Sequence, residues 1–206
     1  MKHEPMLLTK LAQDNHGRFR EVIGLIGTHH GVGVTHTGLL LAFYFGEELG
    51  KKTALLECNR HRDMQLIEQA YEWETDEKNT FSFRHITCYK EVKPGQIPRI
   101  LSEDYEYVIM DFGTDLSSNL EELLRCTTKI IVAGRSEWDI LKLKAFISNA
   151  EIICGSQNWT YYLVRAGDRI IVRLRKELKN YLWAVPDIQE PTHINHTARA
   201  FFKRCF

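Results

Sequence analysis

The sequence predicts an α/β fold, in which a doubly wound, mostly parallel sheet carries helices on both faces. Short runs that are almost wholly apolar, such as 107–111 (YVIMD) and 129–133 (KIIVA), are typical of strands that are covered on both sides. These runs alternate with segments of helical spacing, which is the order expected of parallel strands joined by crossover helices.

The first half of the domain begins with a buried strand at 21–27 and a helix at 35–49, which Gly50 suits as the residue after its end. A short apolar strand at 53–57 follows, and then a helix at 63–73 with Met64 and Ile67 at helical spacing. The polar run 72–80 is predicted to be a loop, 83–88 a strand, and 98–103 a short helix that starts at Pro98.

The second half repeats the alternation of strands and helices. Ser136 suits the N-cap of a long helix, and Pro186 ends the last strand. The strands are expected at 107–111, 129–133, 160–164 and 181–185, and the helices at 116–124, 136–150, 169–178 and 195–206. Residues 1–20 are interpreted as a polar lead-in with a helical turn at 6–11, and residues 21–206 as a single domain.

Composition narrows the functional classes. The 206 residues suffice for one domain with a substantial core, and 27 basic against 27 acidic residues give no global electrostatic reason to bind nucleic acid or an anionic membrane. The five cysteines are widely spaced without a C-x-x-C pair, which indicates reduced thiols in a cytoplasmic protein. No run resembles a secretory signal or approaches about 20 apolar residues.

The segment 27–37 (GTHHGVGVTHT) has the outline of a phosphate-binding loop between a strand and a helix. Against the pattern G-x-x-x-x-G-K-[ST], Gly33 and Thr35 match, whereas Thr28 replaces the first glycine and Val34 the lysine. Glycines let backbone amides converge on an anion at the positive end of the helix. Without the lysine, the loop lacks a charge-assisted hydrogen bond to phosphate, which would contribute about 1.5–3 kcal/mol. It also lacks the positive charge that stabilises the transition state of phosphoryl transfer. The alternative to a phosphate-binding loop is a tight glycine turn that joins the strand to the helix and binds no ligand.

The run 29–36 (HHGVGVTH) resembles the K-G-G-V-G-K-T-T motif of the ParA/MinD group of deviant P-loop ATPases, which includes the pilus-assembly relative TadZ. The family's signature lysine, which reaches across a dimer, falls on His29, and its phosphate lysine falls on Val34. The resemblance implies a P-loop NTPase-like domain that contacts ATP or ADP through His29, His30, Gly31, Val32, Gly33, Val34, Thr35 and His36.

The resemblance extends to three later segments. The family's L-L-I-D-x-D strand end reads LLECN at 55–59, so that Glu57 keeps the first acid and Asn59 replaces the hydrolytic aspartate. The run 105–111 (YEYVIMD) resembles a Walker B strand, which makes Thr35 and Asp111 the candidates for Mg²⁺ and leaves Asn59 and Asp111 as the catalytic candidates. The run 181–186 resembles the strand before the base-binding loop, and Arg165 stands where an asparagine is common.

Two lysines and a hydrolytic aspartate are missing together, which favours a pseudo-ATPase that acts as a scaffold or localisation factor through a homodimer or a protein partner. A role in a pilus or secretion machine, as for TadZ, is one version that the resemblance implies. Two alternatives stay open: an active Mg²⁺-dependent ATPase in which His29 replaces the signature lysine, and a nucleotide-dependent enzyme acting on a small molecule.

Two further features allow more than one interpretation. His29, His30 and His36 cluster in the loop, with His61 in reach, but consecutive histidines rarely point the same way, so a metal site is disfavoured. Asp63 begins either a surface helix or a switch region.

The last helix has an apolar face flanked by basic residues. We prefer docking of this face on its own domain or on a partner, and peripheral contact with the inner face of the membrane is the alternative. The apolar face comprises Ala198, Phe201, Phe202, Cys205 and Phe206, and the flanking residues are Arg199, Lys203 and Arg204.

Overall fold

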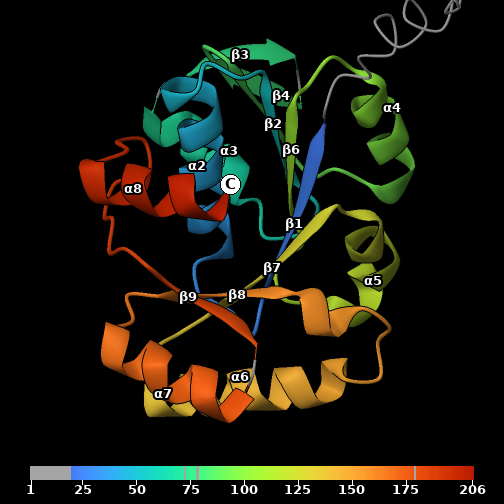
Figure 1. Cartoon of the computed structure of the whole chain (residues 1–206). Helices are drawn as coiled ribbons and strands as arrows, with labels where there is room; N and C mark the ends of the chain where they lie inside the picture. The colour runs from blue at the N-terminus through green and yellow to red at the C-terminus, as the bar shows by residue number, and fades with distance from the viewer. Residues whose placement is uncertain (1–19, 72, 78, 179) are drawn as a thin grey trace, which may run out of the picture.

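A nine-stranded sheet in the order β3-β4-β5-β2-β6-β1-β7-β8-β9 organises the protein in this computed structural model (Figure 1). The structure describes residues 20–71, 73–77, 79–178 and 180–206, so the helical turn expected at 6–11 lies outside the described residues. All strand pairs from β5 to β9 are parallel, and only β3 with β4 and β4 with β5 are antiparallel. The predicted doubly wound, mostly parallel sheet is therefore confirmed.

The helix labels begin at α2. The strands are β1 (Glu21–Gly27), β2 (Thr53–Glu57), β3 (Glu74–Glu77), β4 (Thr80–Phe83), β5 (Ile86–Tyr89), β6 (Tyr107–Asp111), β7 (Thr128–Ala133), β8 (Thr160–Val164) and β9 (Tyr181–Val185). The helices are α2 (Val34–Phe43), α3 (Asp63–Tyr71), α4 (Ile97–Ser102), α5 (Leu116–Arg125), α6 (Glu137–Ala150), α7 (Asp168–Leu178) and α8 (His196–Cys205). Short helical turns cover Tyr44–Glu48, Pro94–Gln96 and Ser156–Asn158.

Two hydrophobic cores lie on opposite faces of the sheet. Side chains of α2, α3 and α8 pack on one face, and side chains of α4, α5, α6 and α7 pack on the other. In Figure 1, α2 and α8 lie to the left of the central strands and α4 and α5 to the right. Burial on both faces explains why the central strands read as continuous apolar runs rather than as alternating ones.

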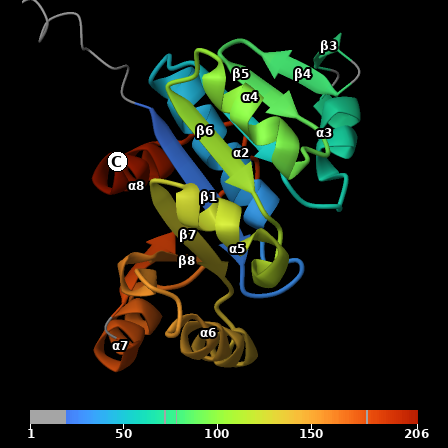
Figure 2. The same cartoon turned by 90° about the vertical axis from the view of Figure 1, so that its right-hand side faces the viewer.

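The sequence-based prediction was wrong at the edge that begins with β3. The segment 72–80 contains β3 and the start of β4, and the single strand predicted at 83–88 is a hairpin of β4 and β5. Arg84 adopts a left-handed conformation with φ of 51° in the turn between them. Figure 2 shows this hairpin at the end of the sheet away from α6 and α7. Pairing between strands stabilises a polar edge strand that its composition does not predict.

The helix predicted at 35–49 forms in two parts. The regular helix α2 ends at Phe43, and Tyr44–Glu48 continues it as one π-helical turn, after which Gly50 has the left-handed φ of 63° expected at a helix end. Gly46 in this turn faces Ile86, because a Cβ atom there would lie 2.3 Å from its Cγ1. The close approach of this turn to β5 leaves no room for a larger residue.

Helix α8 docks on its own domain through the apolar face seen in the sequence. The ring of Phe202 lies 5.1 Å from that of Tyr44 between centroids, and the ring of Phe201 lies 5.4 Å from that of Tyr162. Both phenylalanines are 2% exposed or less, and Arg199 Nε lies 2.6 Å from Glu48 Oε2. The chain therefore covers this face itself, as in the preferred interpretation.

No helix among residues 20–71, 73–77, 79–178 and 180–206 is long and apolar enough to cross a bilayer.

We expect Phe202→Ala to lower the free energy of unfolding by about 3–5 kcal/mol, because it empties a packed site between α8 and the turn Tyr44–Glu48. Lys203→Ala is the matched control on the exposed side of the same helix and should change this value by no more than about 0.5 kcal/mol. Urea titration monitored by circular dichroism measures both. Equal, small effects of the two substitutions would show that α8 does not dock as described.

Candidate nucleotide-binding site

The glycine loop connects β1 to α2 at the carboxyl end of a central strand. Gly31 and Gly33 have φ angles of 75° and 98°, and a Cβ atom at either position would meet nothing within 4 Å. Backbone conformation, rather than lack of space, therefore requires glycine here. No side chain caps the start of α2, so the amides of its first turn are left without a partner in the helix. This arrangement is a nest of backbone N–H groups, a geometry that suits an anion.

Val34, at the position of the phosphate lysine, lies underneath the loop. Its side chain is 6% exposed. A Cβ atom on Gly27 would lie 2.7 Å from both Val34 Cγ2 and Val32 Cγ1, which shows that both valines pack against the end of β1. Position 34 thus contributes to the core and presents no charge to the nest.

Thr35, Asp63 and Asp111 converge at the floor of the nest. The Thr35 hydroxyl donates to Asp111 Oδ2 at 2.7 Å and lies 3.3 Å from Asp63 Oδ2. Asp111 Oδ1 accepts the backbone N–H of Gly113 at 2.9 Å. The adjoining cavity of about 300 Å³ is lined by loop residues together with His61, Asp63, Gly113 and Thr114. The structure thus brings together both residues that the sequence proposed for Mg²⁺.

Two buried carboxyl groups stand at the ends of neighbouring strands. Burial raises the pKa of Asp111, against the opposing hydrogen bonds from Thr35 and Gly113. Burial also raises the pKa of Glu57, whose oxygens accept the backbone N–H groups of Met64 at 3.2 Å and of Glu91 at 3.1 Å. Glu57 thus fixes the loops that follow β2 and β5, and does not line the cavity beside the nest.

The residues present fit a magnesium ion. Mg²⁺ commonly keeps several waters and binds through one or two carboxylates, a hydroxyl and substrate phosphates. Asp111 and Asp63 supply two carboxylates beside the Thr35 hydroxyl, next to a nest that suits phosphate oxygens. These three side chains would hold the ion, either directly or through water.

Asn59, at the position of the hydrolytic aspartate, makes two hydrogen bonds to the backbone. Its Nδ2 donates to the carbonyl oxygen of Asp111 at 3.2 Å, and its Oδ1 accepts the N–H of His61 at 2.9 Å. Both ends of the amide therefore shape the loop after β2. Asn59 also lacks the carboxylate that could act as a base.

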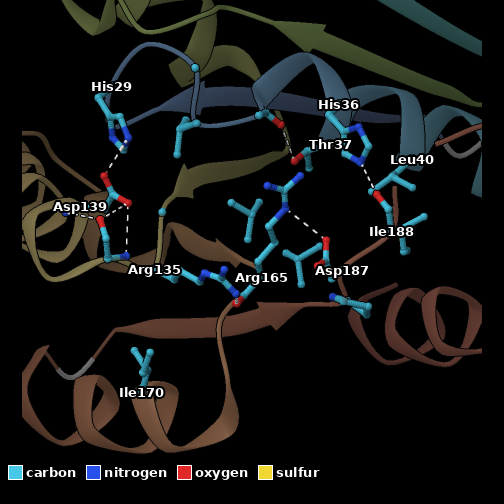
Figure 3. A pocket seen from close by; sticks show the side chains of 18 of the residues that line it. His29, His36, Thr37, Leu40, Arg135, Asp139, Arg165, Ile170, Asp187 and Ile188 are labelled. Carbon is cyan, nitrogen blue, oxygen red and sulfur yellow. Dashed lines mark hydrogen bonds and ion pairs between the residues drawn. The ribbon is translucent and has the colours of Figure 1, made fainter. Parts of the chain in front are cut away.

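His29, at the position of the signature lysine, turns toward α6 of its own chain. Its Nε2 lies 3.1 Å from Asp139 Oδ1 (Figure 3). Its Nδ1 lies 2.9 Å from Thr28 Oγ1. Burial and the charge of Lys142 lower the pKa of His29, although Asp139 opposes this shift. The lowered pKa favours a neutral ring at neutral pH.

The other histidines of the loop point in different directions. His30 contacts His61 edge to face with centroids 5.1 Å apart, whereas His36 Nε2 lies 2.8 Å from the carbonyl oxygen of Ile188. Burial lowers the pKa of His36. Within the described part of the chain, no group of three or more His, Cys, Asp or Glu side chains could hold a metal ion.

A larger cavity of about 760 Å³ opens on the other side of the loop (Figure 3). Apolar side chains including Leu40, Val164 and Ile170 line it, together with the first turn of α2 and the segment after β9. Arg165 extends into it and places its Nε 3.1 Å from Asp187 Oδ1. The volume and the apolar lining suit a nucleoside beside the anion nest.

No protein-family model and no curated protein matches this chain. Several solved structures match it in fold. A ParA family ATPase from Chlorobium tepidum TLS has a TM-score of 0.64 and 15% identity, over 91% of this chain and 93% of that chain. MinD from Pyrococcus horikoshii OT3, complexed with Mg-ADP, has a TM-score of 0.62 and 14% identity, over 89% and 93%. The MinC:MinD complex from Aquifex aeolicus has a TM-score of 0.60 and 17% identity, over 87% and 86%.

These structures show that the chain has the ParA/MinD P-loop NTPase fold, as the motif resemblance implied. At these identities the likeness concerns the fold alone, and what the site does is argued from its own residues.

Three residues of this region escaped the sequence analysis. Asp139 pairs with His29 and also completes a capping box with Ser136, a local signal that was readable as S-x-x-D. Arg135 and Asp187 line the larger cavity from loops after β7 and β9. No local pattern marks those two residues, because parallel pairing alone brings the strand ends together.

We expect Asp111→Asn to raise the free energy of unfolding at pH 7. Because the folded-state pKa of Asp111 is raised, its contribution to stability is present below the ordinary pKa of about 3.9 and is lost as pH rises through the folded value. Asparagine can still accept the N–H of Gly113 and donate to Thr35. The substitution should therefore flatten the decline in stability between pH 4 and 7, measured by urea unfolding at each pH.

Asp115→Asn is the control, and it should change the free energy of unfolding at pH 7 in the opposite direction. Hydrogen bonds from Ser118 and Ser117 lower the pKa of Asp115 to about 2, so its stabilising contribution is present at pH 7 and is lost in acid. A loss of stability at pH 7 in Asp111→Asn, as in Asp115→Asn, would contradict the assignment of a destabilising buried charge.

Proposed function

We propose that this chain is a degenerate ParA/MinD-like pseudo-ATPase. It binds ATP or ADP with Mg²⁺ weakly, hydrolyses it slowly or not at all, and acts as a scaffold or localisation factor through a homodimer or a protein partner. One observation carries the proposal: the anion nest and the Thr35–Asp111 pair are intact, whereas the positions that would supply charge or a base are engaged elsewhere.

Nucleotide binding is supported by the retained half of the site. The nest supplies backbone donors, Thr35 and Asp111 supply magnesium ligands, and the 760 Å³ cavity accommodates a nucleoside. The Pyrococcus MinD structure contains Mg-ADP on the same fold. When bound, Mg²⁺ neutralises phosphate charge. The residues of this chain orient the phosphates and the ion rather than activate water.

The loss of hydrolysis is supported by three side chains. Val34 packs under the loop, His29 pairs with Asp139 of its own chain, and Asn59 is held by two backbone hydrogen bonds. Phosphoryl transfer depends on charge stabilisation and on an oriented nucleophile. Positions 29, 34 and 59 supply neither the charge nor the base, so we infer that the site binds nucleotide without hydrolysing it.

The proposed action through a homodimer or a protein partner rests on analogy with other proteins of this fold. The Aquifex MinD structure is a complex with MinC, and a TadZ-like role in a pilus or secretion machine is the version that the motif resemblance favours. The protein is proposed to act in the cytoplasm.

Because α8 is docked, contact of its apolar face with a membrane would require α8 to leave the domain.

Isothermal calorimetry with Mg-ATP tests the proposal on the native chain, Val34→Lys and Val34→Met. We expect weak binding by the native chain and binding about tenfold to a hundredfold tighter by Val34→Lys, because a charge-assisted bond contributes about 1.5–3 kcal/mol. Val34→Met is the matched control, since it adds length at the same position without charge, and its affinity should stay near that of the native chain.

Turnover is measured on the same preparations by phosphate release. The proposal expects none above background for the native chain. Sustained hydrolysis that disappears in Thr35→Ala would overturn it and favour the active ATPase, with His29 as the residue that replaces the lysine. Absence of binding in both the native chain and Val34→Lys would make the loop a structural turn.

A further inference from the structure

A third cavity, here called the arginine groove, adjoins the larger cavity of the proposed nucleotide site and shares part of its lining. It has a volume of about 690 Å³ and runs between the carboxyl ends of β8 and β9 and the exposed side of α8. Arg135 and Arg165 belong both to this groove and to the larger nucleotide cavity, whereas Arg204 and Thr197 come from α8. The groove thus joins three elements that are distant in sequence.

The described lining residues of the groove are strongly basic in a chain of zero net charge. Three arginines face one carboxylate, Asp187, so these residues carry a charge of 3 − 1 = +2. The carboxylate pairs with Arg165 Nε at 3.1 Å, which uses one of the five donors of that guanidinium. The other two arginines are positioned by neutral groups and keep their full charge.

Neutral groups contact both of these guanidinium groups. Arg135 Nη1 donates to the carbonyl oxygen of Arg165 at 3.0 Å, and the guanidinium of Arg204 lies 6.0 Å from the centre of the Trp183 ring. A carbonyl oxygen and an aromatic face orient a cation without cancelling its charge. Such pre-orientation reduces the entropy lost when an anion binds.

The backbone of Arg165 supports the same conclusion. Arg165 has a left-handed φ of 56°, which is unfavourable for a long side chain and is usually taken by Gly, Asn or Asp. Arg165 thus holds this conformation where it lines both the groove and the larger cavity. The small residues Ala166, Gly167 and Ala200 leave room for a ligand beside it.

We propose that the arginine groove binds a phosphate monoester group. Such a group carries a charge of about −1.5 to −2 at pH 7 and three acceptor oxygens, which match a net charge of +2, several guanidinium donors and the Thr197 hydroxyl. A carboxylate carries one charge and engages one arginine fork, so it fits less well. No residue of the glycine loop is among the described residues that line the groove, and the ligand of the groove is either a soluble phosphorylated molecule or a lipid headgroup.

Calorimetry with inorganic phosphate, without Mg²⁺, tests the site on the full chain. The double variant Arg165→Asn/Arg204→Gln removes two charges, keeps a residue that tolerates left-handed φ, and keeps an aliphatic stem over Trp183. We expect it to lose the site or to bind at least about tenfold more weakly, which corresponds to one charge-assisted hydrogen bond. Arg125→Gln on α5, an exposed arginine away from the groove, should bind phosphate as the native chain does.

Two further arms identify the ligand. Acetate should bind at least about tenfold more weakly than phosphate, as a charge-assisted bond is lost. Cosedimentation with phosphatidylcholine vesicles, with and without phosphatidic acid, assigns the phosphate to a lipid if retention needs phosphatidic acid and both arginines. Retention by neither vesicle, together with saturable phosphate binding, assigns it to a soluble ligand.

The proposal is overturned if neither phosphate nor phosphatidic acid vesicles bind, if the double variant binds as Arg125→Gln does, or if acetate equals phosphate. Mg-ATP is titrated in parallel on every variant. Because Thr35→Ala removes a magnesium ligand of the loop and leaves the groove intact, it should weaken only Mg-ATP binding. Failure of the nucleotide proposal is thereby separated from failure of this one.

Discussion

The buried carboxylate of Asp111 is the contact on which the carboxyl edge of the sheet depends. The carboxylate accepts hydrogen bonds from the Thr35 hydroxyl and from the N–H of Gly113. The backbone carbonyl oxygen of Asp111 accepts the N–H of Cys58 and the side-chain amide of Asn59. One residue of β6 thus fixes the start of α2, the turn after β6 and the loop after β2. Hydrogen bonds to a charged group contribute about 1.5–3 kcal/mol each, which offsets part of the cost of burying the charge.

The same contact supports the shape of the glycine loop, although residues 27–37 contain no lysine. The shape of the nest is set by left-handed glycines and by the position of α2, and both are maintained by packing and by Asp111 rather than by the missing charges. Val34 even strengthens the support, since it packs against Gly27 at the end of β1. The geometry of the loop therefore does not depend on the side-chain charges that phosphoryl transfer would need.

The charges that this chain does possess near the site are displaced from the nest. His29, whose lowered pKa favours a neutral ring, contacts Asp139 of its own chain. Arg135, Arg165 and Arg204 line the arginine groove, and the first two also line the larger cavity. The fixed positive charges at this edge of the sheet thus lie near β8, β9 and α8, whereas the loop between β1 and α2 offers backbone N–H groups.

The sequence by itself determined the fold class, most strand positions and the glycine loop, because apolar runs, glycine spacing and strand ends are local signals. The family resemblance named Thr35 and Asp111 as candidates for one site, and the structure shows the hydrogen bond between them. Tertiary structure alone decided the β4–β5 hairpin and the π-helical turn after Phe43, since both arise from pairing or packing with distant segments. It also decided the contacts of His29 and Asn59 and the convergence of Arg135, Arg165 and Arg204. Parallel strands bring loops together that lie 30 to 70 residues apart, and no local pattern records which of their side chains meet.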